Sequence, residues 1–485
     1  MEEQNNQSLK QRTAQGLFWG AMNSGTTQIL NLAFGIVLGR LLSPDEYGIV
    51  GVLTIFTAIA ADLQSSGFTQ GLVNRKRIDE KDYNAVFTFN VGMSAGMYAI
   101  LFFASPLIAE FFHQPCLTIV SRVVFLTFLI ASLGIAHGGY MAKRMMNREI
   151  AIIGFLALLT SGGTGITLAC LGYGYWSLAW QQVAYVTVIT LGRYFFVKTW
   201  RPRITLRLTP IREMAPFAMN ILVTKIVTTL SNNLLTVIFG RLFPIHQVGN
   251  YSQAFKWDTM ASSLVSNTVG QVAQPVLYES NAGNEKERQL RVFRKMVRFT
   301  SFLSMPLMFG LAIISREFIL LTIGSEWEGC VLMLQILCLS GAFLPIHTMY
   351  QNLAISRGKS NVFMWLSLAQ IVLQLLIILS THRFGMTVMV CAYSLLIILW
   401  LLPWHFFVSR MTGYRWCDVA KDIVPFMLVA LAVMAVTFLA TTSLSSLYLQ
   451  LALRIFMAAV LYATVMYIGK VEILNECIQF IKRKG

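Results

Sequence analysis

Cationic and amide side chains occur inside stretches of this sequence that are otherwise apolar. Lys225 lies near the middle of one such stretch, which also holds Asn220 and Asn232, and Lys256 lies in the next one. Lys225 and Asn232 are seven residues apart, so a helix would place both on one face. An ammonium group binds anions such as phosphates, and amides exchange hydrogen bonds with hydroxyl groups. Because ionisable groups are costly at membrane depth, they are candidates for a functional site.

Further polar groups lie at comparable positions. A polar line continues along the stretch that holds Lys256, and other candidates for binding are spread over the first half of the chain: Asn267, Gln271, Arg122, Asn23, Asn31 and Asn90. Four more residues are candidates for ion coupling or gating: Asp62, Asp258, Arg40 and Arg241. Asp62 is the main candidate for coupling because a carboxylate can take up a proton or Na⁺.

Each of these residues also has a purely structural interpretation. Arg122 and Arg454 could extend their side chains to the membrane interface. Lys256 could pair with Asp62 or Asp258 as a structural lock, and isolated amides often bond neighbouring helices. The sequence predicts neither a metal site nor a cofactor, since His137 and His347 have no second His or Cys at ligand spacing.

The composition indicates which elements must position these groups. Of the 485 residues, 56% are hydrophobic and only 12% are charged, whereas a soluble domain has about 25% charged residues. We therefore expect an all-α integral membrane protein without a sizeable soluble domain. Fourteen apolar stretches are long enough to be spans, at residues 14–38, 48–73, 84–112, 116–140, 150–171, 175–197, 214–239, 248–276, 296–315, 329–354, 361–381, 385–408, 422–442 and 447–469.

The distribution of Lys and Arg supports this count. Of the 38 such residues, 29 fall in alternate connections and only four in the connections between them. Cytoplasmic loops carry the excess of positive charge, so both termini are predicted to be cytoplasmic. The net charge of +16 is then explained by topology, and a nucleic-acid partner is not expected. No P-loop is present, so an ATP-driven pump is excluded.

A short motif occurs twice. GRLLSPDEYG at 39–48 follows the first expected span, and GRLFPIHQVG at 240–249 follows the seventh. The copies are offset by 201 residues, and six spans separate them, so both face the same side of the membrane. This predicts a parallel duplication, with two lobes related by an axis along the membrane normal. The alternative is chance similarity between two short loops.

Several motifs carry a family resemblance. They include GR-L-L at 39–42, Tyr47-Gly48, GFTQGLVNR at 67–75, IGSEWEGCVLMLQILCL at 323–339 and QNLAISRGKSNV at 351–362. With these, the chain resembles the polysaccharide-exporter branch of the MOP flippase superfamily, in the group that includes the colanic acid exporter. The resemblance covers nearly the whole chain.

The resemblance implies two pseudo-symmetric six-helix lobes around a central cavity, plus two C-terminal helices. The expected parts are a cytoplasmic N-terminus (1–13), an amino-terminal lobe (14–200), a carboxy-terminal lobe (201–410), two added helices (411–470) and a cytoplasmic tail (471–485). The resemblance also implies that the protein moves an undecaprenyl-diphosphate-linked oligosaccharide across the bacterial inner membrane, with no covalent chemistry. The bilayer and the polysaccharide polymerase machinery are the further partners expected.

Such a cargo needs cations for its diphosphate and hydrogen-bonding groups for its sugars, which the candidate residues supply. Three other functions remain open. A peptidoglycan-precursor flippase would make the same demand for cations. A cation-coupled multidrug antiporter should instead have an acidic or aromatic cavity. A membrane glycosyl-transfer enzyme would need a large external loop, and the outward connections here are short.

Overall fold

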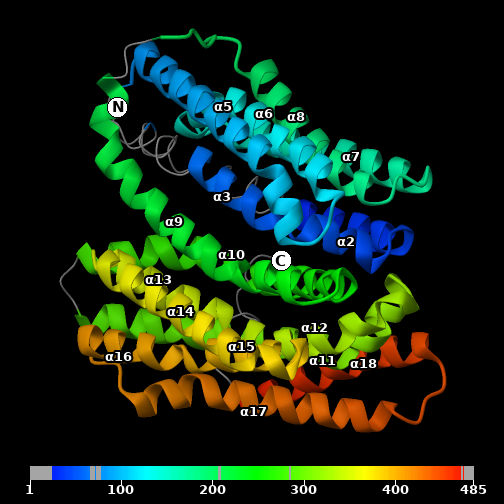
Figure 1. Cartoon of the computed structure of the whole chain (residues 1–485). Helices are drawn as coiled ribbons and strands as arrows, with labels where there is room; N and C mark the ends of the chain where they lie inside the picture. The colour runs from blue at the N-terminus through cyan, green and yellow to red at the C-terminus, as the bar shows by residue number, and fades with distance from the viewer. Residues whose placement is uncertain are drawn as a thin grey trace. The chain divides into compact units, whose positions relative to one another are not determined.

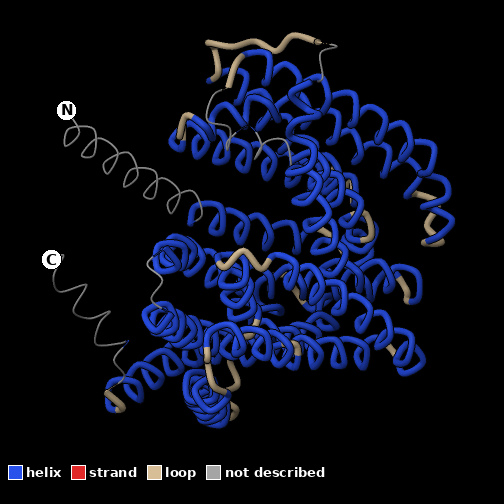
Figure 2. The backbone as a smooth tube through the Cα atoms, turned by 90° about the vertical axis from the view of Figure 1, so that its left-hand side faces the viewer, coloured by secondary structure: helices blue, strands red, loops and turns tan. Residues whose placement is uncertain are grey.

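The computed structural model of the protein describes residues 25–65, 72, 78–205, 209–282, 286–470 and 473. Every regular element within these ranges is a helix (Figure 2). Nine segments of the described chain are long and apolar enough to cross a membrane, and the longest is Glu287–Thr322. The prediction of an all-α multi-pass membrane protein is therefore confirmed. The exact number of fourteen spans stays a prediction, because the stretches expected at 175–197, 214–239 and 248–276 are helical but are not among the nine.

The chain divides into two compact units, which we call the first unit (Met1–Gly249) and the second unit (Asn250–Gly485). The first unit contains a helix over residues 25–41, followed by α2 (Pro44–Gly51), α3 (Thr54–Ser65), α5 (Glu80–Phe111), α6 (Leu117–Lys143), α7 (Asn147–Cys170), α8 (Tyr175–Phe196), α9 (Thr209–Leu242) and the start of α10 (Ile245–Ala282). Helix α9 packs against α3 and α5 (Figure 1). It is thus grouped with the first unit, although the lobe boundary was expected at residue 200.

Local sequence signals explain how the first helices begin. Ser43 caps α2, with Pro44 in the first turn, and the backbone N–H of Ser43 donates a 2.7 Å hydrogen bond to Glu46 Oε2. This is a capping box, which satisfies the free N–H groups of the first turn. Helix α2 ends at Gly51, and α3 starts again at Thr54. The apolar stretch expected as a single span over 48–73 is therefore broken at residues 52–53.

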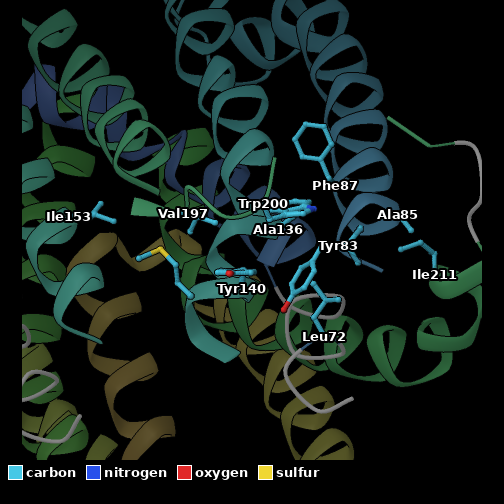
Figure 3. Close-up of a cluster of buried hydrophobic side chains, with 12 residues drawn as sticks. Leu72, Tyr83, Ala85, Phe87, Ala136, Tyr140, Ile153, Val197, Trp200 and Ile211 are labelled. Carbon is cyan, nitrogen blue, oxygen red and sulfur yellow. The ribbon is translucent and has the colours of Figure 1, made fainter. Parts of the chain in front are cut away.

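An aromatic cluster closes one end of the first unit. Figure 3 shows Tyr83 of α5, Tyr140 of α6 and Trp200 lying together among buried aliphatic side chains. The ring centroid of Tyr83 lies 5.5 Å from that of Tyr140 and 5.4 Å from that of Trp200. Such contacts stabilise the junction of α5, α6 and the segment after α8 beyond simple apolar burial.

The second unit is organised around α11 (Lys286–Thr322), which contacts α12, α13, α16, α17 and α18. The other elements of this unit are η1 (Ser325–Trp327), α12 (Glu328–Gly341), α13 (Leu344–Ser356), α14 (Ser360–Thr381), η2 (His382–Phe384), α15 (Met386–Leu399), α16 (Leu401–Thr412), α17 (Trp416–Thr441) and α18 (Leu447–Ile468). The two expected C-terminal helices are therefore α17 and α18, and both pack on α11 (Figure 1).

Candidate functional site

Two polar groups are hydrogen-bonded where α3 and α9 pack together, and a lysine lies one helical turn away along α9. The hydroxyl group of Thr229 on α9 donates a short hydrogen bond to Asp62 Oδ2 on α3. Lys225 precedes Thr229 by one helical turn, so its side chain leaves α9 on the same face. Lys225 is half-buried, and none of the residues that the structure describes forms an ion pair or hydrogen bond with it. Within the described part of the chain, the structure thus places a cation without a partner one turn along α9 from the threonine that binds the Asp62 carboxylate.

The amides expected near Lys225 have different surroundings. Asn232 lies seven residues further along α9 and is exposed. Asn220 belongs to the same helix, but its side chain lies outside the described residues, as does that of Gln271 on α10. Asn267 on α10 is exposed, and Asn23 lies outside the described chain altogether. Their predicted roles in binding stay predictions.

Two other amides are in the interior of the first unit. Asn31 lines a cavity of about 500 Å³. Asn90 on α5 is fully buried, and neither its oxygen nor its nitrogen has a hydrogen-bond partner among the described residues. A buried amide without a partner costs free energy, so Asn90 remains a candidate for contact with water or a ligand.

Two of the predicted arginines are held by α5. Arg122 Nε donates a 2.8 Å hydrogen bond to Ser105 Oγ, and its guanidinium group lies 4.2 Å from the Phe102 ring centroid. Arg241 donates a 2.7 Å hydrogen bond to the carbonyl of Phe111, the last residue of α5. A cation at a helix C-terminus is favoured by the free carbonyl groups there. Both contacts fit a structural role, while Arg40 is exposed at the end of the helix over residues 25–41.

The second unit contains the other two charged candidates, both on α10. Lys256 is half-buried, and its Nζ lies 5.6 Å from the centroid of the Trp257 ring. Asp258 is almost fully buried, and its Oδ1 has no partner among the described residues. Gly341 of α12 lies so close that a Cβ there would overlap this oxygen. The alternative of a lock between Lys256 and a carboxylate stays a prediction.

The interfacial interpretation of Arg454 is wrong. Arg454 is only 4% exposed and donates a 2.7 Å hydrogen bond to Glu317 Oε2, which is 2% exposed. It also donates to the Thr441 hydroxyl group at 3.0 Å and to the Ile313 carbonyl at 2.8 Å. A buried guanidinium group requires such partners. The pair joins α18 to α11.

The two copies of the repeated motif lie against each other within the first unit. A Cβ on Gly48 would overlap the carbonyl oxygen of Ile245 and would lie 2.9 Å from Ile245 Cγ1. A Cβ on Gly249 would overlap the carbonyl oxygen of Pro44 and would lie 2.6 Å from its carbonyl carbon. Both glycines are therefore required for close backbone approach. The exposed side chains of Asp45 and His246 also approach to 3.7 Å at this contact.

Comparison with known sequences now decides the family. Residues 37–332, more than half of the chain, match the family described as "Polysaccharide biosynthesis protein". The chain belongs to this family. It is similar to the lipopolysaccharide biosynthesis protein WzxC of Escherichia coli (strain K12), with 23% identity over 361 residues, which cover 73% of this chain and 72% of that protein. It is also similar to the succinoglycan biosynthesis transport protein ExoT of Rhizobium meliloti (strain 1021), with 25% identity over 356 residues and coverage of 73% and 71%.

Solved structures show which fold this member of the polysaccharide biosynthesis family adopts. The lipid II flippase MurJ, in an inward closed conformation, superposes with a TM-score of 0.73 at 13% identity, covering 93% of this chain and 99% of that one. An inward-facing multidrug resistance MATE family transporter of the MOP superfamily gives a TM-score of 0.66 at 14% identity, with coverage of 80% and 95%. The fold of the MOP superfamily, expected from the motifs, is confirmed.

Sequence reasoning missed part of the cavity that Asn31 lines. Gln181, Gln182 and Tyr185 of α8 form much of its polar wall. The sequence does contain a signal, because two adjacent glutamines inside an apolar stretch are unusual at membrane depth.

Proposed function

We propose that this protein is a flippase that moves an undecaprenyl-diphosphate-linked oligosaccharide from the cytoplasmic to the outer leaflet of the bacterial inner membrane. Membership of the polysaccharide biosynthesis family supports this function, as do relatives named for lipopolysaccharide biosynthesis and succinoglycan transport. The exported product would serve the synthesis of a surface polysaccharide or of lipopolysaccharide.

The observation that carries the proposal at the level of residues is the half-buried Lys225, which has no partner among the described residues. A diphosphate cannot enter a hydrocarbon layer unless cations offset its loss of hydration. The Lys225 ammonium group would bind it, while the prenyl chain stays in the lipid. Asp62, held by Thr229 one turn away, would keep the ammonium charge balanced while the site is empty.

The finer architecture belongs to the same proposal. Fourteen spans form two six-helix lobes related by duplication, with two additional C-terminal helices and both termini in the cytoplasm. Transport proceeds by alternating access without covalent chemistry, and Asp62 is the residue that takes up a proton or Na⁺ if a gradient drives it. The polysaccharide polymerase machinery would receive the cargo on the far side.

The test is complementation of a strain that lacks its own exporter, with lipid-linked sugars measured by mass spectrometry. Lys225→Ala should reduce export about 10- to 100-fold, because a charged hydrogen bond contributes about 1.5–3 kcal/mol. Lys225→Arg should retain part of the activity, and Lys421→Ala, an exposed lysine on α17, is the matched control.

Full export by a well-expressed Lys225→Ala protein would remove this residue from the mechanism. Rescue of a strain depleted of its peptidoglycan-precursor flippase, without rescue of polysaccharide export, would reassign the cargo. Export of cationic drugs alone would favour the multidrug antiporter.

A further inference from the structure

A cavity whose largely apolar lining includes several amide and hydroxyl groups lies in the first unit. Its volume is about 500 Å³, and its walls come from the helix over residues 25–41 and from α3, α6, α7 and α8. Cavities of about 300–1,000 Å³ commonly hold small ligands. None of the side chains that line it, all from the described part of the chain, is charged. The second unit has a cavity of similar size, about 470 Å³, whose lining is almost wholly aliphatic or aromatic.

The amides that line this cavity have unused hydrogen-bonding capacity. Asn31, Gln181 and Gln182 have no hydrogen-bond partner within the described ranges. By contrast, the lining hydroxyl groups of Thr127 and Ser161 each donate to a carbonyl of their own helix, at 2.6 and 3.1 Å. Each hydroxyl oxygen can still accept, and each amide can both donate and accept. The wall therefore presents a mixed set of donors and acceptors without a net charge.

This chemistry matches sugar hydroxyl groups. A sugar ring presents alternating donors and acceptors at its edge, which amides can satisfy in pairs, and an apolar face. The partly exposed Tyr185 ring supplies an amphipathic aromatic surface in the same wall. A phosphate or carboxylate would have no cation to offset its loss of hydration there. The cavity is therefore suited to uncharged sugar residues and unsuited to the diphosphate.

One helix links the cavity wall to the carboxylate that binds Thr229. Thr57, Ala58 and Ala61 of α3 line it. The residue after Ala61 is Asp62, which accepts the hydrogen bond from Thr229 on α9. Helix α3 thus contributes both to the cavity wall and to the hydrogen bond with α9, and every residue involved belongs to the first unit.

Two close approaches to α7 shape the wall. A Cβ on Gly162 would lie 2.5 Å from the Phe34 ring, and a Cβ on Gly165 would lie 3.3 Å from Cδ of Gln181. These glycines allow the helix over residues 25–41 and α8 to pack closely on α7. The amide of Gln181 is therefore held in place by packing against a helix backbone.

Resting on the proposed function, we infer that this cavity is a subsite that binds uncharged sugar residues of the lipid-linked oligosaccharide. It is distinct from the group around Lys225, which binds the diphosphate. The subsite would let the protein favour loaded carrier lipid over bare carrier lipid.

The experiment measures binding by the full-length protein in detergent to two probes. One is undecaprenyl diphosphate without sugar, and the other is the lipid-linked oligosaccharide extracted from a host that lacks the exporter. Wild-type protein should bind the second more tightly. Gln182→Leu should reduce this difference about tenfold, the effect of losing one or two amide hydrogen bonds, with affinity for the bare lipid kept within about twofold. Asn31→Leu, which alters the wall formed by the helix over residues 25–41, should reduce the same affinity difference. Gln247→Leu, at an exposed residue on α10, should change neither affinity.

Several outcomes would overturn the inference. Equal wild-type affinity for both probes would remove the subsite and leave the flippase function intact, whereas no binding of either probe would remove the proposed function itself. Equal losses for both probes in correctly folded Gln182→Leu and Asn31→Leu proteins, judged by their melting temperatures, would also contradict it.

Discussion

The buried pair between Arg454 and Glu317 allows a quantitative test of how the C-terminal helices are held. Arg454 Nη1 lies 2.7 Å from Glu317 Oε2, and both side chains are at most 5% exposed. The guanidinium group also lies 4.8 Å from the Phe438 ring of α17. One side chain from α18 therefore ties together α11, α17 and α18. Removing either partner would leave a charge buried in an apolar interior.

The expected magnitudes follow from this geometry. Breaking a buried ion pair by removing one partner costs about 3–5 kcal/mol. Glu317→Leu should lie at the upper end, because the guanidinium group of Arg454 stays charged in proteins. Arg454→Leu should lie at the lower end, because the remaining carboxyl group can bind a proton and become neutral. The double Leu variant should cost much less than the sum, since it leaves no buried charge.

The assay is the free energy of unfolding from denaturant titration of the purified protein, carried through as a double-mutant cycle. Arg316 and Glu328 provide the matched control, because they approach only to 3.9 Å and their side chains are 57% and 68% exposed. Their Leu variants should change stability by about 0–1 kcal/mol. If the two single buried variants behave like this control, or if their costs simply add in the double variant, the argument for a charged clamp is refuted.

Three further predictions test the first unit and the Tyr414–Asp422 contact of the second. Gly249→Ala should destabilise the fold by about 1–3 kcal/mol through overlap with α2, while Gly92→Ala, with open space around it, should stabilise it by about 0.5–1 kcal/mol; equal melting temperatures for the two variants would contradict this. Asp62→Asn should retain cargo binding and lose any dependence of transport in vesicles on a proton or Na⁺ gradient, and an unchanged dependence would remove Asp62 from coupling. Tyr414→Phe should cost about 1 kcal/mol in denaturant titration, since its hydroxyl group donates a 2.8 Å hydrogen bond to the buried Asp422; no loss would show this bond to be dispensable.

Hydropathy predicted the helices most accurately where one apolar run forms one uninterrupted helix. The stretch expected at 116–140 is α6 (Leu117–Lys143), and the stretch expected at 150–171 is α7 (Asn147–Cys170). The stretch expected at 48–73 begins as two helices, α2 and α3, and hydropathy did not predict the break between them at residues 52–53. The Thr54 hydroxyl group, which donates a 2.6 Å hydrogen bond to the Gly51 carbonyl there, is compatible with either a continuous or a broken helix.

The site was harder to predict because partners are distant in sequence. Arg454 looked like an interfacial residue, since its partner Glu317 is 137 positions away and only packing brings the two together. The link between Asp62 and Thr229 spans 167 positions. The presence of a polar or charged residue at membrane depth therefore indicated a candidate for a functional role. It could not indicate which candidates form hydrogen bonds or ion pairs within the protein.

The two copies of the repeated motif make reciprocal backbone contacts. An offset of 201 residues carries Pro44 onto Ile245 and Gly48 onto Gly249. In the structure Gly48 lies against Ile245, and Gly249 lies against Pro44. The glycine of each copy therefore contacts, in the other copy, the residue at the same motif position. Reciprocal contacts of this kind are what a local twofold axis would produce. The other copy's backbone occupies the space that a side chain would fill at each glycine, which is compatible with the predicted parallel duplication.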